Sequence, residues 1–209
     1  MHSHGSEPGF QFDLSGGSLC LDLSNTVSRR KVPERAADHL GSYADLVAFA
    51  EQSKILSPKQ SDELRAQARR HASQARETLR NAISLRENLY GVFSALAKGK
   101  PAAPGHLRQI NDSAVEALTH RRLTPADGLY RWEWQWNNKN VLDRILWPIA
   151  QSAAELLTSP ELDSLRECEA PDCAWLFLDQ SRNRSRRWCD MKVCGNRQKA
   201  RRHYQRTRQ

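Results

Sequence analysis

Two cysteine pairs near the C-terminal end constrain the fold of this chain most. Cys168 and Cys173 are followed, after fifteen residues, by Cys189 and Cys194, so both pairs have the same four-residue gap. Each pair can bind one side of a tetrahedral ion, and four thiolates suit zinc. Four protein ligands leave no open coordination position for catalysis, so the pattern predicts a structural zinc site.

The residues around the cysteines predict a small treble-clef-like zinc finger, made of a β-hairpin and a helix. Pro171 and Asp172 favour a tight turn between the first two cysteines. An apolar strand is expected over 174–178, and the polar stretch 180–187 is expected to be the exposed connection of a hairpin. From Asn196 onward the chain lacks Gly and Pro, so we expect a helix there. Its first N–H groups could donate to the sulfur atoms.

Disulfide bonds are the alternative use of these cysteines. The chain has five cysteines, an odd number, and its N-terminal stretch does not have the pattern of a secretory signal peptide. Both features favour a reducing compartment. We therefore predict zinc rather than disulfides, and a cytoplasmic protein.

A family resemblance rests on two short motifs. Cys194-Gly195-Asn196-Arg197, with the upstream cysteines and the basic residues that follow, resembles the CGNR zinc-finger family of bacterial proteins. In that family the finger follows a helical domain called ABATE, described as part of stress-induced transcription regulators. The stretch 19–26, LCLDLSNT, is similar to the L-D-F-V-N-T start of that domain, with departures at Leu23 and Ser24. The family's function is itself inferred, so the resemblance implies more about architecture than about activity.

The resemblance implies two domains that together cover nearly the whole chain. A helical, ligand-sensing ABATE-like domain would span residues 1–160, and the finger with its basic helix would span 161–209. We expect the helical domain to fold without the finger and without zinc.

Local patterns predict a mainly α fold for the first domain, with one small β-hairpin. Ser42 and Asp45 have the spacing of a helix start, as do Ser57 and Gln60 around Pro58. The second of these helices is expected to reach about Ala97, with a break near 71–73. Two further helices are expected over 106–118 and over 141–157, the latter kinked at Pro148.

Tryptophans alternate along the expected hairpin, and polar residues cluster near residue 22. Period-two spacing places Trp132, Trp134 and Trp136 on one strand face, and we favour packing of the three indoles against the helices. The alternative is an aromatic pocket for a small molecule. For the polar cluster we favour capping and turn hydrogen bonds over a ligand site. The candidate ligand-binding residues are Asp22, Asn25, Thr26, Trp132 and Trp134.

Positive charge is concentrated in the finger. The chain has a net charge of +8, and from Arg166 onward twelve Lys and Arg stand against five Asp and Glu. This asymmetry indicates a polyanionic partner, nucleic acid before membrane, and no apolar run has membrane-spanning length.

Arginine can bind phosphates and guanine edges, which favours a regulator that binds nucleic acid, DNA first. The candidate residues are Arg182, Arg184, Arg186, Arg187, Arg197, Lys199, Arg201, Arg202 and Arg206. Arg197 has a second interpretation, in which it braces the finger through a backbone carbonyl or Asp190. A finger of this size supplies little sequence specificity by itself. A homodimer that binds through two fingers is therefore an alternative to a monomer.

The alternative function is a protein-interaction or ligand-binding module whose finger is purely structural. The sequence contains no recognised catalytic motif, and the lone Cys20 between apolar neighbours is typical of a core thiol. We therefore expect that the protein is not an enzyme.

Overall fold

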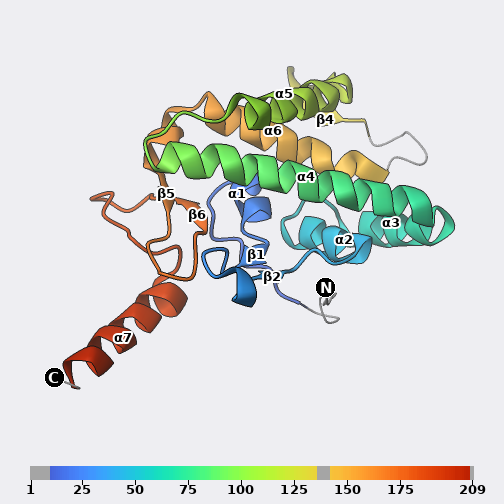
Figure 1. Ribbon diagram of the computed structural model, residues 1–209. Coiled ribbons are helices and arrows are strands. Elements are labelled where there is room, and N and C mark those ends of the chain that lie inside the picture. The colour runs from blue at the N-terminus through green and yellow to red at the C-terminus, as the bar shows by residue number, and fades with distance from the viewer. Residues whose placement is uncertain (1–9, 136–141, 208–209) are drawn as a thin grey trace.

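The structure of the chain is a computed structural model that describes residues 10–135 and 142–207. Its centre is the short helix α1 (Leu19–Ser24), which packs between the long helices α4 (Ala72–Ala97) and α6 (Leu146–Leu157). Helix α5 (Pro104–Thr119) lies against α4 and α6 (Figure 1). Helices α2 (Tyr43–Gln52) and α3 (Pro58–Arg70) pack on each other and on α4. Burial of Leu21 and Leu23 in α1 makes this motif the middle of the core.

The predicted helix starts are confirmed. The Ser42 hydroxyl accepts a hydrogen bond from the Asp45 N–H at 3.2 Å, and Ser57 and Gln60 form a reciprocal capping box. His71, with φ −126°, separates α3 from α4, which confirms the break predicted near 71–73. The helix expected over 106–118 begins two residues earlier, at Pro104, because proline suits a first helical position.

The kink predicted at Pro148 is replaced by a change of helix type. A 3₁₀ helix, η2 (Leu142–Ile145), leads into α6, which begins at Leu146. Pro148 therefore lies in the first turn of α6, where a missing N–H removes no intrahelical hydrogen bond. Residue 141, the expected first residue of this helix, lies outside the described residues.

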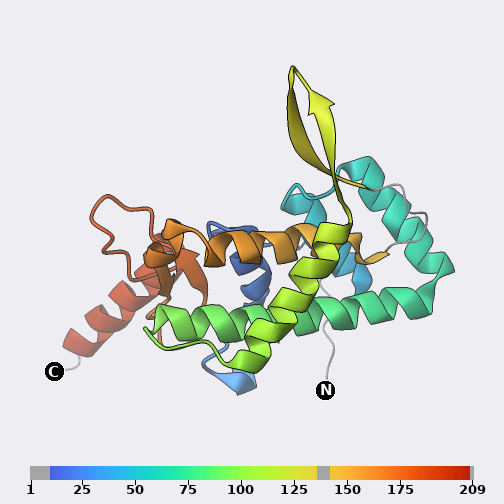
Figure 2. The same cartoon turned by 90° about the horizontal axis from the view of Figure 1, so that it is seen from above.

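Strands β3 (Arg121–Ala126) and β4 (Leu129–Trp134) form a hairpin that projects from the body (Figure 2). Asp127 and Gly128 both have positive φ, which suits a two-residue hairpin turn. Trp134 packs against Trp147 of α6, with 6.3 Å between the ring centroids.

We expected all the hairpin indoles to pack against the helices. This prediction is wrong for Trp132, whose side chain is 54% exposed. The hairpin projects from the body, and the Trp132 ring contacts the Arg121 guanidinium of the neighbouring strand, 5.2 Å from the ring centroid. Trp136 lies outside the described residues.

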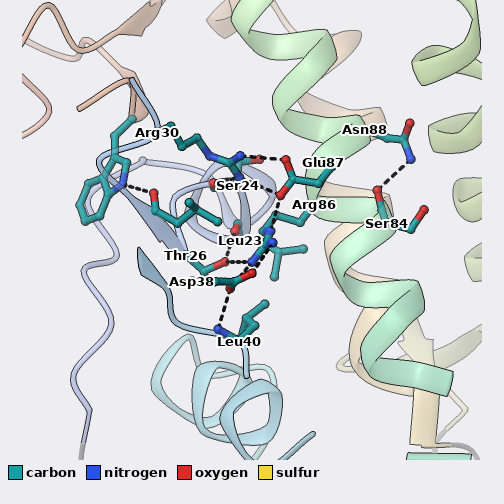
Figure 3. Close-up of polar contacts among 12 residues, drawn as sticks. Leu23, Ser24, Thr26, Arg30, Asp38, Leu40, Ser84, Arg86, Glu87 and Asn88 are labelled. Carbon is teal, nitrogen blue, oxygen red and sulfur yellow. Dashed lines mark hydrogen bonds and ion pairs between the residues drawn. The ribbon is translucent and has the colours of Figure 1, made fainter. Parts of the chain in front are cut away.

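An ion-pair network fastens the short strands β1 (Val27–Ser28) and β2 (Ala37–Asp38) to α4 (Figure 3). Arg86 of α4 is 3% exposed and donates to both carboxylate oxygens of Asp38, at 2.6 and 2.8 Å. Burial raises the pKa of Asp38, but the hydrogen bonds and charge of Arg86 outweigh burial and lower it. Glu87 accepts from both Arg86 and Arg30. The turn between β1 and β2 contains a 3₁₀ helix, η1 (Pro33–Arg35).

The C-terminal segment begins inside the same core. After the 3₁₀ helix η3 (Pro160–Ser164), strands β5 (Leu165–Glu167) and β6 (Leu176–Leu178) pair in antiparallel fashion. Leu176 and Leu178 point into the main helical core, whereas Phe177 between them packs with the cysteines. One strand thus serves two apolar clusters through its alternating faces. Helix α7 (Asn196–Arg206) extends away from the body (Figure 1). Among the described helices, none is both long and apolar enough to cross a membrane.

Candidate metal centre and basic helix

The first cysteine pair lies in the turn of the β5–β6 hairpin. The Cys168 N–H donates to the Trp175 carbonyl at 2.8 Å, and the Cys173 N–H donates to the Ala170 carbonyl at 3.2 Å. The predicted strand over 174–178 is therefore present as β6, but the predicted hairpin connection is wrong. The strand partner of β6 precedes the cysteines, and the stretch 180–187 joins no described strand. Asp179 instead organises that stretch, by accepting from the N–H groups of Ser181 and Arg186.

The second pair lies at the start of α7. The Asp190 carboxylate accepts from the Val193 N–H at 2.7 Å and caps a π-helical turn, η4 (Met191–Gly195), which leads into α7 at Asn196. A Cβ atom at Gly195 would lie 2.9 Å from the Met191 sulfur and 3.2 Å from Trp188. The turn is therefore tight at Gly195, and a larger residue there would require the Met191 side chain, which is 47% exposed, to move.

The four predicted ligands converge. Their sulfur atoms all lie within 4.8 Å of one another, and all four residues are buried. The sulfur of Cys189 is 3.6 Å from those of Cys173 and Cys194. Ligands of a tetrahedral zinc ion with Zn–S bonds of about 2.3 Å are about 3.8 Å apart, so the arrangement fits such an ion.

The pKa of the Cys194 thiol is lowered by its neighbours in the cluster. The contact with Cys168 raises the pKa of Cys194, but hydrogen bonds with Cys173 and Cys189 outweigh it and lower that pKa to about 7. Contacts with the neighbouring thiols raise the pKa of Cys173 and Cys189 instead, so the case for a metal ion rests on the convergence of the four sulfur atoms.

Arg197 of the CGNR motif braces the finger. Its guanidinium donates to Asp172 Oδ2 at 3.0 Å and to Cys194 Sγ at 3.2 Å, and so connects the two cysteine pairs. The bracing interpretation is supported, but the acidic partner is Asp172 and not Asp190, whose carboxylate caps η4. Burial lowers the pKa of Arg197, but the bond to Cys194 and the charge of Asp172 outweigh burial and raise it.

The finger is hydrogen-bonded to the helical segment at several points. The Trp175 indole N–H donates to the Val27 carbonyl at 2.9 Å, and the Leu178 N–H donates to the Gly16 carbonyl at 2.9 Å. Lys31 donates to the Cys168 carbonyl at 2.7 Å and lies 3.4 Å from Glu167. No local pattern in the sequence indicates these contacts, because each joins residues far apart along the chain.

Eight of the nine predicted nucleic-acid-binding residues fall into two groups. Three are used within the finger. Arg186 donates to the Trp188 and Cys189 carbonyls, Arg187 forms an ion pair with Glu169, and Arg197 braces the cysteine pairs. Five more of the predicted residues are exposed and form no ion pair within the described ranges: Arg182, Arg184, Lys199, Arg201 and Arg206. Arg202 is on α7, but its side chain lies outside the described part of the structure.

The structure does not bring the candidate ligand-binding residues together. Trp132 and Trp134 are in the projecting hairpin, whereas the other three are at α1 (Figure 2). Thr26 donates to the Leu23 carbonyl at 2.8 Å, which is a local turn bond of the predicted kind. Asn25 is structural too, but it bonds to Leu176 in a distant strand and not within a cap or turn. Asp22 accepts from the Gly16 N–H at 2.8 Å, and burial raises the pKa of Asp22 to about 7.

Comparison with protein families agrees with this geometry. Residues 17–160 match the ABATE family, described as "Putative stress-induced transcription regulator", and residues 164–207 match the CGNR zinc finger. No curated protein matches the chain. The ABATE match covers more than half of the chain, and the four buried cysteines of the CGNR match form a metal-binding cluster. The protein therefore belongs to the ABATE family and ends in a CGNR zinc finger.

Proposed function

We propose that this protein is a transcription regulator that binds DNA through α7 and the 180–187 loop. The observation that carries the proposal is the exposed position of α7 and the positive charge on it. This helix extends from the body, and its cations Lys199, Arg201 and Arg206 are exposed without ion pairs among the described residues. A helix of eleven residues is about 16 Å long, and the major groove of B-DNA, about 12 Å wide, admits a helix.

The proposed ion is zinc, and its role is structural. Four thiolates complete a tetrahedral shell, so no position would be left for a substrate. The bound ion would hold the turn of the β5–β6 hairpin against the start of α7, and thereby fix where α7 begins. In this role the ion contributes to folding and not to chemistry. We accordingly propose a binding protein, not an enzyme, that acts in the bacterial cytoplasm where DNA is accessible.

The test is a fluorescence-anisotropy titration of mixed-sequence duplex DNA at several salt concentrations. The test variant replaces Lys199, Arg201 and Arg206 with alanine. Each phosphate contact contributes about 0.9 to the slope of log K against log salt, so loss of three contacts should reduce the slope by about 2.7. Equal binding by the parent and this variant at every salt concentration would reject α7 as the contact surface.

A matched control removes the same charge elsewhere. Arg69 of α3 and Arg76 and Arg80 of α4 are exposed and have no ion pair among the described residues. Their replacement with alanine lowers the net charge by the same three units. If the control loses as much affinity as the α7 variant, binding reflects net charge and not a site on α7.

A protein-interaction role has one observation in its favour. Leu129, Tyr130 and Trp132 at the outer part of the β3–β4 hairpin are 75%, 72% and 54% exposed. Exposed apolar side chains on a projecting ribbon suit a protein contact, including a homodimer. Sedimentation of the parent and of a Tyr130→Ser/Trp132→Ser variant measures whether this ribbon joins two copies.

Ligand sensing by the helical segment is a separate proposal. A cavity of about 280 Å³ lies among α4, α5 and α6, and the side chains of Asn81, Asn88 and Gln109 line it. Amide side chains at such a cavity can fix the orientation of a small polar molecule. Asn88 already bonds to the Ser84 carbonyl and to His106, so within the described structure Asn81 and Gln109 are the amides that we propose for the ligand.

A further inference from the structure

A crevice of about 210 Å³ separates β1 from the finger. Ser28 and Arg29 of the helical segment line one part of it, and Asp190, Cys194 and Arg197 line another. Arg29 is therefore close to the base of α7, although the two are far apart in sequence. Figure 1 shows the turn between β1 and β2 on the same side of the body as α7.

The backbone of Arg29 has an unusual conformation. Its φ is +57°, in the left-handed region that non-glycine residues rarely adopt. Such a residue costs on the order of 1 kcal/mol and persists where surrounding structure or function requires it. The Arg29 carbonyl accepts from the Val32 N–H at 2.9 Å, so the turn fixes the backbone.

The cations of this turn differ in what they contribute to the fold. Arg30 forms an ion pair with Glu87 and lies over the Tyr90 ring, and Lys31 bonds to the finger. Arg29 and Arg35 are exposed, and neither forms a hydrogen bond or ion pair through its side chain within the described ranges. Two cations of this turn thus hold the fold together, and two are left available to solvent.

Acidic groups near Arg29 do not neutralise it through a direct pair. Asp13 and Asp190 line the same crevice, but neither forms an ion pair with Arg29 in the described structure. The Asp190 carboxylate accepts a hydrogen bond from the Val193 N–H. Arg29 therefore presents an exposed guanidinium at the crevice beside α7, and a guanidinium can bind phosphate oxygens.

We infer that Arg29 and Arg35 form a second phosphate-binding element, so that one nucleic-acid duplex contacts α7 and the β1–β2 turn together. The inference rests on the proposed function, because it extends the surface of α7 onto the helical segment. On this surface the helical segment also contacts the backbone of the duplex. Phosphate contacts of this kind position a protein on DNA without reading its sequence.

The experiment uses the full chain loaded with zinc and the same mixed-sequence duplex. The Arg29→Ala/Arg35→Ala variant should reduce the slope of log K against log salt by about 1.8, at about 0.9 for each phosphate contact. An Arg29→Lys/Arg35→Lys variant keeps both charges and should keep most of the slope. The control Arg69→Ala/Arg76→Ala removes two charges elsewhere and should leave the slope unchanged.

The outcomes separate this inference from the proposed function. If the parent binds and the Arg29/Arg35 alanine variant keeps the parental slope, the inference fails and the role of α7 stands. If the parent does not bind duplex DNA even at low salt, both fail. Zinc content and the thermal unfolding midpoint of each variant show whether it is folded. If the alanine substitution at the strained position 29 unfolds the chain, Arg29→Gly removes the charge without that strain and gives the same two outcomes.

Discussion

Asn25 and Leu176 exchange two hydrogen bonds across 151 positions of the chain. The Asn25 amide donates to the Leu176 carbonyl at 2.8 Å, and the Leu176 N–H donates to Asn25 Oδ1 at 2.9 Å. Both residues are buried. The side-chain amide of Asn25 therefore pairs with the Leu176 backbone as a peptide group of a neighbouring β-strand would. It joins the end of α1 to β6, and thus the ABATE segment to the finger.

Substitution of this asparagine should destabilise the whole molecule. Asn25→Asp keeps an acceptor for the Leu176 N–H but removes the donor to the buried Leu176 carbonyl. Leaving a buried polar group unsatisfied costs about 1–3 kcal/mol, and we expect a loss of at least that size in the free energy of unfolding. Urea denaturation measures it, with the exposed Asn111→Asp as control. A loss below about 0.5 kcal/mol, the usual range for surface changes, would contradict a joining role for this pair.

Removal of the finger should disrupt the helical segment. From sequence we expected residues 1–159 to fold alone, but Leu165, Leu176 and Leu178 belong to the main core. A fragment ending at Ser159 loses these side chains and leaves α1 partly uncovered. For this fragment we expect a broad thermal transition and binding of a hydrophobic dye. A fragment ending at Asp179 keeps the β5–β6 hairpin, and we expect it to unfold more sharply and to bind less dye. A sharp, parent-like transition of the shorter fragment would restore the original expectation.

One metal ion should bind per chain, through the four buried cysteines. Cys189→Ser removes the ligand at the start of the η4 turn, and elemental analysis of the purified variant should show loss of the ion. Cys20→Ala is the control, because Cys20 is buried in the helical core and not in the cluster. The same analysis of the parent identifies the metal. Full metal retention by Cys189→Ser would reject the ligand set.

Arg197 should matter more for finger stability than for DNA affinity. Arg197→Ala removes hydrogen bonds to Asp172 and Cys194, and bonds of this charged kind contribute roughly 2 kcal/mol. We expect faster metal release to a chelating dye, with less effect on anisotropy titrations than the α7 triple variant. An Asp172→Asn variant alone and in combination completes a double-mutant cycle. Additive effects on metal release would show that the pair is not coupled.

Asp22 should make stability depend on pH. Burial raises its pKa in the folded state to about 7, from an ordinary value near 3.8. The folded state therefore binds the proton more tightly, and this contribution is full below about pH 4 and is lost as pH rises towards 7. At about 1.4 kcal/mol for each unit of pKa, the change can reach about 4 kcal/mol.

The matched variant for this prediction is Asp22→Asn, whose amide oxygen can still accept from the Gly16 N–H. The difference in unfolding free energy between the parent and Asp22→Asn should shift in favour of the variant between pH 4 and pH 7. A constant difference across this range would show that Asp22 titrates normally in the fold.

Local signals in the sequence predicted much of this architecture. The capping box of Ser57 and Gln60 and the equal spacing of the cysteine pairs depend on residues close together, whose chemistry is visible in the sequence. The partner of β6 was not predicted, because strand pairing depends on which segments meet in three dimensions. The Arg86–Asp38 pair is unpredictable for the same reason.

Exposure is a second limit on prediction. The period-two spacing of Trp132 and Trp134 predicted a shared strand face, but not how far the hairpin would extend beyond the helices. At the metal centre, composition identified the basic residues, but it did not predict which of them form hydrogen bonds or ion pairs within the finger. Arg186 and Arg187 have internal partners that only the folded finger reveals.

The double-sided packing of β6 also has a consequence for synthesis. During synthesis, Leu176 and Leu178 emerge from the ribosome about 150 residues after α1, which they cover. Domains commonly fold as units while the chain is being made, at about 5–20 residues per second, so α1 waits for about 8–30 seconds with an apolar face uncovered. During that interval the nascent chain is exposed to chaperones and proteases. The core around α1 is therefore complete only after β6 has been made.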